Sequence, residues 1–247
     1  ILRKKCQQNS IKTSKKLAQQ GDASTQYNLG VCYYNGYGIP ENKNEAYKWF
    51  KLATEQGHTD AQYNLGVCYY DGVGVKENKS EAVKWFRLAA EKDNARAQYN
   101  LGICYINGYG IPENKQEAFK WFKLAAEQGH ADGQYESGVC YYNGYGVKEN
   151  KSEAVKWFRL AAEHGNTSAQ HNLGVCYYYG YGVKENKSEA VKWYRLAAEQ
   201  GNAYAQYKLG LCYYSGYVVK ENKSEAVKWF RLAAEQGLSD AQYNLGL

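Results

Sequence analysis

The chain has 247 residues, with 31 Lys and Arg against 25 Asp and Glu. The positive excess lies in residues 1–21, which hold six cations and no acid, so the remaining residues balance at 25 of each sign. A neutral array lacks the basic surface that phosphate binding requires, so nucleic acid is excluded as a partner. No apolar run approaches the roughly 18 residues of a membrane helix, so membrane insertion is excluded as well.

Residues 1–22 are predicted to form a basic, degenerate half-repeat or N-terminal capping helix. The stretch from Leu17 to Gly21 resembles the end of the second helix of the units described below, without its tryptophan. The basic residues of this segment are Arg3, Lys4, Lys5, Lys12, Lys15 and Lys16. The sequence has no Met and stops within a predicted helix at Leu247, so we interpret it as a fragment in which targeting signals cannot be judged.

Residues 23–247 are predicted to be one array of 36-residue repeats. Self-similarity at this period, in units too short to bury a core alone, indicates a solenoid. The predicted repeats are 23–58, 59–94, 95–130, 131–166, 167–202, 203–238 and a truncated 239–247. Positions within a repeat are numbered from Thr59 as position 1.

The first half of each repeat is predicted to be an amphipathic helix, called helix A. Its inward stripe is expected at positions 3, 7 and 11, which hold Ala61, Leu65 and Tyr69. A glycine within a helix costs about 1 kcal/mol relative to alanine, so Gly66 indicates close approach by a second helix. Gly72 is expected to end helix A in the left-handed conformation.

The second half is predicted to be another helix, called helix B. It begins with a capping box, in which Asn78 caps the helix and Glu81 reaches back to it. Helix B is expected to turn an apolar side inward and a charged side outward. The inward residues are Ala82, Trp85, Phe86 and Ala89, and the outward ones are Glu81, Lys84, Arg87 and Glu91.

Six of the seven cysteines occupy one equivalent position per repeat, as in Cys68 and Cys104. Equivalent atoms of stacked helices lie roughly 9 Å apart, beyond the roughly 7 Å between Cα atoms that a disulfide tolerates. We therefore expect free, buried thiols and a reducing compartment, which favours the cytoplasm.

The motifs of the array resemble a known family. Leu-Gly followed by Tyr, Gly-x-Gly-Val, Ala-x-x-Trp and Ala-Ala-x-x-Gly are similar to those of the Sel1-like repeats, relatives of the tetratricopeptide repeats. The resemblance implies an all-α fold, an α/α superhelical solenoid in which helix A lines the concave side. It also implies an adaptor or scaffold role in signalling, protein quality control or host–microbe contact. The paired cysteines of the family's cysteine-rich bacterial branch are absent, so that branch's disulfides and periplasmic location do not carry over.

If helix A lines a groove, its positions 5, 9, 12 and 13 face the partner. Tyrosines there would give rigid contact area with a polar tip, while neighbouring residues set specificity. The alternative is that the tyrosines pack between adjacent A helices, and for position 5 both interpretations stay open. The predicted partner-binding residues are Tyr27, Tyr34, Asn35, Tyr63, Tyr70, Asp71, Tyr99, Asn107, Tyr135, Tyr142, Asn143, His171, Tyr178, Tyr179, Tyr207 and Tyr214.

Catalytic, metal and cofactor motifs are not predicted. The four histidines lack metal-ligand or triad spacing, and His171 and Cys176 diverge on one helix. We predict a non-catalytic scaffold whose groove binds an extended peptide or a partner's helix; a small-molecule ligand is not expected. Two alternatives remain open: a carbohydrate- or cell-wall-binding module that stacks sugars on the tyrosines, and a regulatory interaction region of a larger signalling protein.

Three repeats break the pattern. Repeat 4 has Gly133 and Ser137 where Ala and Leu are usual, so its helix A is expected to be the least stable part of the array. Repeat 6 has Val218 in place of a loop glycine. Repeat 2 ends in Lys92 and Asp93, where the other repeats have glutamine or histidine followed by glycine. The last two changes are expected to alter stacking or to provide contacts, and the sequence does not decide between these.

Overall fold

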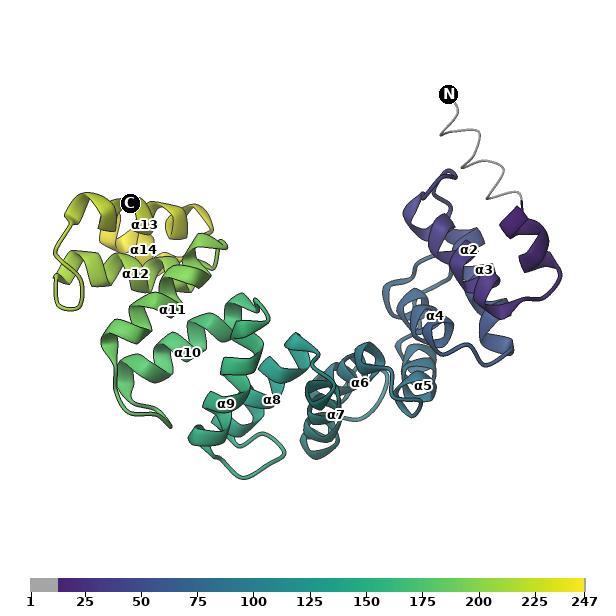
Figure 1. Ribbon diagram of the computed structural model, residues 1–247, viewed down its shortest axis with the longest axis horizontal. Coiled ribbons are helices and arrows are strands. Elements are labelled where there is room, and N and C mark those ends of the chain that lie inside the picture. The colour runs from purple at the N-terminus through teal and green to yellow at the C-terminus, as the bar shows by residue number, and fades with distance from the viewer. Residues whose placement is uncertain (1–12, 247) are drawn as a thin grey trace. The chain divides into compact units, whose positions relative to one another are not determined.

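The computed structural model describes residues 13–246, and the regular secondary structure in this range is helical (Figure 1). Arg3, Lys4, Lys5 and Lys12 of the basic segment lie outside the described residues. The A helices are α2 (Ala23–Asn35), α4 (Thr59–Asp71), α6 (Ala95–Asn107), α8 (Ala131–Asn143), α10 (Thr167–Tyr179), α12 (Ala203–Ser215) and α14 (Ser239–Leu245). The B helices are α3 (Lys43–Glu55), α5 (Lys79–Ala90), α7 (Lys115–Glu127), α9 (Lys151–Glu163), α11 (Lys187–Glu199) and α13 (Lys223–Glu235).

The chain divides into two units, residues 1–125 and 126–247. Within each unit, helix A packs on helix B of its own repeat, as α4 does on α5 and α10 on α11. Helix B then packs on helix A of the next repeat, as α5 does on α6 and α11 on α12. This alternation gives each unit the architecture of an α/α solenoid. Within residues 13–246, no helix combines the length and the apolar character that crossing a bilayer requires.

The segment before the array contains a helix at residues 13–19. Ala18 is buried, and its carbonyl accepts a hydrogen bond from Nε2 of Gln26 at 3.0 Å. Gln98 makes the equivalent bond to the carbonyl of Ala90, at the end of α5. Residues 13–19 therefore contact α2 in the way that the end of a helix B contacts the following helix A.

Helix A ends where the sequence predicts. Gly72 has a φ of 70°, and its N–H bonds to the carbonyl of Cys68. The first turn of helix A is capped by the residue that precedes the helix. In α4, His58 Nδ1 accepts a hydrogen bond from the N–H of Ala61 at 3.3 Å. In α6, Asn94 does the same for Ala97 at 2.9 Å.

Helix B begins with only half of the predicted capping box. Asn78 accepts from the N–H of Glu81 at 3.1 Å, as expected. The N–H of Asn78, however, donates to the carbonyl of Tyr69 in α4 at 2.8 Å, and the Glu81 carboxylate pairs with Lys84. The prediction that Glu81 reaches back was wrong, because a backbone carbonyl at the end of helix A takes that donor. The resulting bond ties the start of helix B to its own helix A.

The two helices of a repeat meet at the helix A glycine. An ideal Cβ on Gly66 would lie 2.6 Å from the ring of Phe86, which is only 1% exposed. Leu65, Ala82 and Ala89 are equally buried around this contact. The close approach predicted from the glycine is confirmed, and the neighbour is the phenylalanine ring of helix B.

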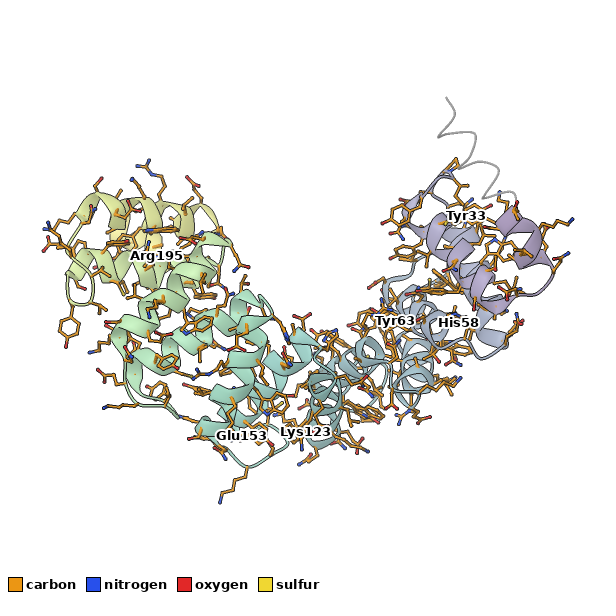
Figure 2. The ribbon with its side chains drawn as sticks, viewed as in Figure 1. Tyr33, His58, Tyr63, Lys123, Glu153 and Arg195 are labelled. Atoms are coloured by element: carbon orange, nitrogen blue, oxygen red, sulfur yellow. The ribbon has the colours of Figure 1, made fainter. Side chains whose placement is uncertain are left out.

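Contacts between repeats differ from the sequence prediction in the B helices. Arg87, predicted to face outward, has its Nη2 donating to the Tyr105 hydroxyl of the next repeat at 2.7 Å. Arg195, labelled in Figure 2, makes the same bond to Tyr213. Trp85 is half-buried, whereas Val83 is 5% exposed and belongs to the core. These corrections follow from the second interface of helix B, which needs a partly polar side against the next helix A.

Repeat 2 ends differently from the others. Asp93 occupies the left-handed conformation with a φ of 59°, where Gly57 and Gly129 stand in the equivalent positions. Lys92 Nζ donates to the carbonyl of Gly57 at 2.9 Å. In repeats 1, 5 and 6 the residue at the Lys92 position is a glutamine that donates to a buried glutamine of helix A, at 2.7, 2.9 and 2.8 Å. Gln62 of repeat 2 has no such donor, and its buried Oε1 makes no hydrogen bond.

Restoring the usual pair, with Lys92→Gln and Asp93→Gly together, is expected to raise the free energy of unfolding by about 1–2 kcal/mol. Glycine removes the strain of a left-handed aspartate, and the new glutamine provides a donor for Gln62. The measurement is urea unfolding followed by circular dichroism. Each single substitution serves as a control and should give part of the gain. An unchanged or lower midpoint for the double variant would contradict this account.

Candidate partner-binding face

Within each of the two units, positions 5, 9, 12 and 13 of the A helices lie on one side, which we call the helix A face. In repeats 1–6, its position 5 residues are half-buried aromatic side chains that rest on helix B of their own repeat, whereas Tyr243 of the truncated repeat is 85% exposed. The Tyr63 ring lies 6.0 Å from Phe86 between centroids, and His171 lies 6.0 Å from Tyr194. The same contact is made by Tyr27, Tyr99, Tyr135 and Tyr207 with Phe50, Phe122, Phe158 and Phe230.

The position 5 hydroxyl groups also contact the next repeat. Nδ2 of Asn100 lies 3.5 Å from the Tyr63 hydroxyl, and Nδ2 of Asn244 lies 3.4 Å from that of Tyr207. Position 5 therefore contributes to packing within and between repeats as well as to the face. Tyr63 is labelled on its unit in Figure 2.

The position 12 tyrosines are held on two sides. The Tyr70 ring rests on the Phe86 ring, with 6.0 Å between their centroids, and Lys79 Nζ lies 3.7 Å from the centroid of the Tyr70 ring. That ammonium also donates to the carbonyl of Tyr70. The equivalent phenylalanine or tyrosine supports Tyr34, Tyr142, Tyr178 and Tyr214. A lysine likewise lies over each of these four rings. Repeat 3 has Ile106 at this position.

A loop tyrosine of the following repeat completes each of two position 12 sites. Tyr109 lies edge-on to Tyr70 at 6.2 Å, and Tyr181 lies edge-on to Tyr142 at the same distance. Both residues are missing from the set predicted from the sequence, although Tyr recurs between the two loop glycines of most repeats. They belong to the face because the loop rests on the preceding repeat: an ideal Cβ on Gly110 would lie 2.3 Å from the carbonyl carbon of Lys79.

Position 13 is exposed in every repeat that has it. Asn35, Asn107 and Asn143 donate to the carbonyl four residues earlier, at 3.0, 3.0 and 3.1 Å. Asp71 is also exposed, whereas Tyr179 lies against Tyr178 with 4.9 Å between ring centroids. Position 13 therefore changes the chemistry of the face without entering the core.

The face is hollowed between repeats. A pocket of about 290 Å³ brings together Tyr27, Tyr34, Asn35 and Tyr63, with Arg96 at its edge. A second, of about 180 Å³, contains Tyr178, Tyr179 and Tyr214, and a third, of about 190 Å³, contains Tyr142 and His171. Tyr70, Asp71, Tyr99, Tyr135, Asn107, Asn143 and Tyr207 are on the helix A face outside these three pockets.

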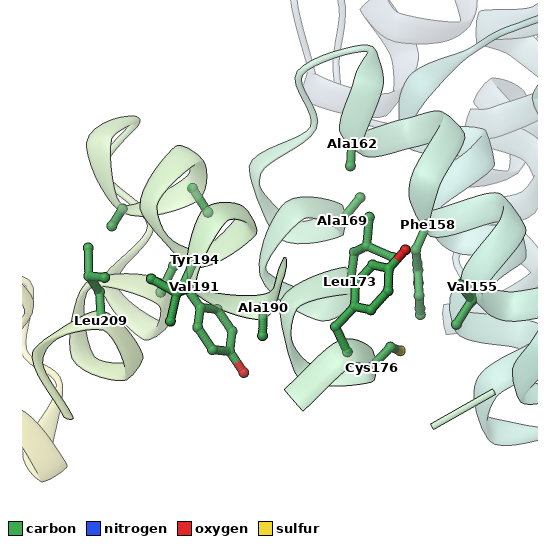
Figure 3. Packing of buried hydrophobic residues seen from close by; sticks show 14 of the residues in the cluster. Val155, Phe158, Ala162, Ala169, Leu173, Cys176, Ala190, Val191, Tyr194 and Leu209 are labelled. Atoms are coloured by element: carbon green, nitrogen blue, oxygen red, sulfur yellow. The ribbon is translucent and has the colours of Figure 1, made fainter. Parts of the chain in front are cut away.

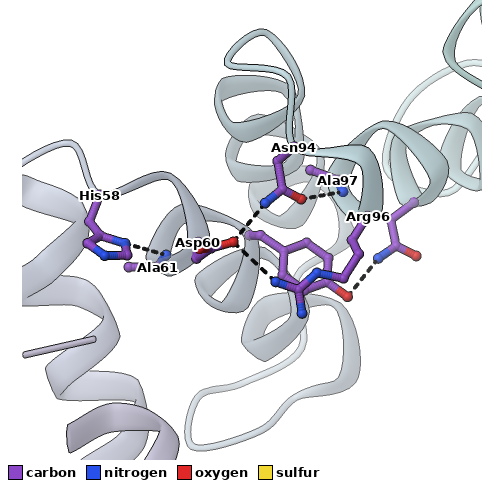
Figure 4. A network of polar contacts seen from close by, with 8 residues as sticks. His58, Asp60, Ala61, Asn94, Arg96 and Ala97 are labelled. Carbon is purple, nitrogen blue, oxygen red and sulfur yellow. Dashed lines mark hydrogen bonds and ion pairs between the residues drawn. The ribbon is translucent and has the colours of Figure 1, made fainter. Parts of the chain in front are cut away.

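A polar network holds the first pocket's cation in place (Figure 4). Asp60 accepts from Asn94 at 2.9 Å and from Arg96 at 3.1 Å, and the Arg96 guanidinium lies 4.7 Å from the Tyr63 ring centroid. Arg96 is absent from the set of site residues predicted from the sequence. The signal was available, because Asp60 and Arg96 occupy equivalent positions in consecutive repeats with opposite charge.

Several cysteines and one histidine of the A helices have pKa values shifted by burial. Burial raises the pKa of the Cys68 and Cys176 thiols to about 12, so both are protonated at neutral pH. Within residues 13–246 no group of three or more His, Cys, Asp or Glu side chains is arranged to hold a metal ion. Burial also lowers the pKa of His171.

The stacked helix pairs and the repeated aromatic face define an α/α solenoid of short tandem repeats, a class of proteins with extended binding surfaces. A family model described as Sel1 repeat matches residues 23–58, 59–94, 95–130, 131–166, 167–202 and 203–238. The chain belongs to the Sel1-repeat family. Proteins of this family are generally non-catalytic scaffolds for protein–protein interaction.

Solved structures place the chain close to other members. It is 38% identical, with a TM-score of 0.88, to a protective antigen present in uropathogenic Escherichia coli strains, covering 95% of this chain and 50% of that one. The chain thus spans half the length of that protein. A Sel1 repeat protein from Oxalobacter formigenes is 33% identical with a TM-score of 0.79, covering 91% and 94% of the two chains.

A more distant structure shares the fold alone. An immunity protein from Pseudomonas aeruginosa is 19% identical with a TM-score of 0.53, covering 89% of this chain and 82% of that one. No curated protein sequence matches the chain.

Proposed function

We propose that the chain is a non-catalytic scaffold whose helix A face binds an extended peptide segment or a helix of a partner protein. The observation that carries the proposal is the row of position 12 tyrosines. Each ring is supported by an aromatic ring of helix B and has a lysine over it, so it loses little conformational freedom on binding.

The pockets support a chain-like ligand. The second and third pockets, of about 180 and 190 Å³, are smaller than the roughly 300–1,000 Å³ of sites for drug-sized molecules. Pockets of this size between successive A helices suit single side chains of one peptide. The exposed residues of position 13 would then select among partners, since they vary from Asn and Asp to Tyr and Ser.

The test compares capture of proteins from a lysate of the source cells by the native array and by two variants. In the first, Asp71, Asn143 and Tyr179 are replaced by arginine, which changes the exposed edge of the face without touching the core. In the second, the matched control, the exposed helix B residues Leu88, Leu160 and Leu196 are replaced by alanine. Circular dichroism verifies folding of both.

A protein retained by the native array and by the helix B variant, but lost from the arginine variant, would support the proposal. Equal retention by all three would refute it. A glycan array then tests the carbohydrate alternative, for which the exposed Tyr179 and Tyr181 rings, stacked at 5.5 Å, would be the platform.

The thiols bear on the compartment. The six described cysteines are free, and five of them are buried. We propose a reducing compartment such as the cytoplasm, where such thiols persist.

A further inference from the structure

Repeats 5 and 6 depart from the other repeats around one pocket, the second described above. Its wall includes Tyr179 where other repeats have Asn, Asp or Ser, and Tyr194 where the other B helices have Phe. It also includes Lys208 at position 6, where most repeats have Asn. Because the repeats are otherwise close copies, each acts as a reference for the others. Three such departures in one pocket indicate a specialised site.

Lys208 changes the charge of this pocket. The equivalent Asn100 of repeat 3 contacts a tyrosine hydroxyl of the preceding repeat. Between repeats 5 and 6, the position of that tyrosine is occupied by His171. Burial lowers the pKa of His171, and the charge of Lys208 lowers it further. Lys208 is half-buried, and no carboxylate of the described residues forms an ion pair with its ammonium. The Lys208 ammonium lies 5.8 Å from the centroid of the Tyr207 ring, a contact that leaves its charge unneutralised. The wall of the pocket therefore includes a cation without a carboxylate partner among the described residues.

Tyr194 adds a polar atom without a partner. Tyr194 is 1% exposed and forms part of the pocket wall. Its hydroxyl nevertheless makes no hydrogen bond to any described residue. Figure 3 shows the ring among buried residues, with the hydroxyl oxygen directed away from Val191 and Leu209. A phenylalanine fills the same space in the other repeats, so the hydroxyl is not required for packing. It is available to donate to a ligand.

The rest of the pocket is aromatic and small. The rings of Tyr178 and Tyr214 line it together with Leu211, and its volume is about 180 Å³. This combination fits one side chain that has an apolar stem and an anionic end. The lysine ammonium and the tyrosine hydroxyl can each donate a charge-assisted hydrogen bond to that end.

We propose that this pocket binds an acidic side chain, of glutamate size, from the peptide segment of a partner protein. The carboxylate would contact the Lys208 ammonium and the Tyr194 hydroxyl, and the methylene groups would lie against Tyr178 and Tyr214. This inference rests on the proposed function, because it assigns a specificity to one part of the helix A face.

The test uses a labelled decapeptide of alternating leucine and glutamate, acetylated and amidated so that only side chains carry charge. The same peptide with glutamine in place of glutamate is the comparison. Fluorescence anisotropy measures binding to the native array at low salt. The glutamate peptide is expected to bind at least tenfold more tightly than the glutamine peptide.

Two variants restore the residues that other repeats have, so neither should impair folding. Lys208→Asn is expected to abolish the preference for glutamate, and Tyr194→Phe to reduce it several-fold. Lys220→Asn, in an exposed loop of the same repeat, removes the same charge outside the pocket and is expected to leave the preference intact.

Equal binding of the two peptides, or an unchanged preference in Lys208→Asn, would overturn the inference. A variant with Tyr70→Ala and Tyr142→Ala, two residues of the helix A face outside this pocket, separates this from failure of the proposed function. If it still weakens binding of both peptides, the face binds peptide without an acidic pocket. If neither peptide binds the native array, the inference about the acidic pocket fails, and the capture experiment still decides the proposed function.

Discussion

Replacement of Gly110 by alanine is expected to lower the free energy of unfolding by more than about 3 kcal/mol. Gly110 has a φ of 70°, a conformation that costs alanine roughly 1–2 kcal/mol. Its Cβ would also lie 2.3 Å from the carbonyl carbon of Lys79 and 2.6 Å from the nitrogen of Ser80. These are backbone atoms at the start of a helix and cannot yield. The loop must therefore leave the preceding repeat, which breaks the bond from Ser80 Oγ to the Gly110 carbonyl at 3.2 Å.

Gly108 provides a matched control in the same loop. Its φ is 69°, and its Cβ would meet no atom closer than 3.6 Å. Gly108→Ala should therefore show the conformational cost alone, about 1–2 kcal/mol. Urea unfolding measures both variants, and hydrogen exchange at the amides of α5 locates the loss. Equal destabilisation by the two substitutions would show that the loop does not depend on close contact with the preceding repeat.

Leu173→Ser is expected to destabilise the chain by roughly 3–5 kcal/mol, and Ser137→Leu to stabilise it by about 1–3 kcal/mol. Both residues occupy position 7 of helix A and are 0% exposed. Leu173 belongs to the core cluster of its unit, together with Phe158 and Tyr194. Ser137 has a buried hydroxyl without a hydrogen-bond partner and lacks the apolar volume of a leucine.

Thermal unfolding of the two variants, with the native array beside them, checks the opposite signs. Leu173→Ala separates lost volume from the cost of a buried hydroxyl and should be less harmful than Leu173→Ser. A decrease in Tm for Ser137→Leu would mean that the surroundings of Ser137 have closed around the smaller side chain. In that case α8 would not be the weak helix that its sequence predicts.

The helices and their ends could be predicted because their causes are local. Gly72 ends α4 and Asn78 begins α5 through bonds to residues within four positions. The partners of Arg87 and of the Asn78 N–H could not be predicted in the same way. Each depends on how two helices are placed against one another: Arg87 contacts Tyr105, 18 residues away. A repeat pattern shows which residues are equivalent but does not show which of them meet.

The same distinction applies to the face. Helical periodicity predicts that positions 5, 12 and 13 share a side of helix A, and the described helices place them there. The lysine over each position 12 ring and the loop tyrosine beside it come from other elements. Tyr109 reaches Tyr70 only because Gly110 allows the loop to rest on Lys79. Lys208 could not be predicted for another reason: one departure from a repeated residue has little meaning until the pocket around it is known.

Contacts between neighbouring repeats have a consequence for how such a chain changes in length. The bonds from Asn100 to Tyr63 and from Asn244 to Tyr207 join residues 37 positions apart, one repeat and one residue. His58 and Asn94, at the junctions on either side of repeat 2, cap the following helix through the same kind of bond. Removing or duplicating residues 59–94 would therefore join compatible ends. Tandem duplication or deletion of such a unit would change the number of repeats in whole steps and leave the contacts within each remaining repeat intact.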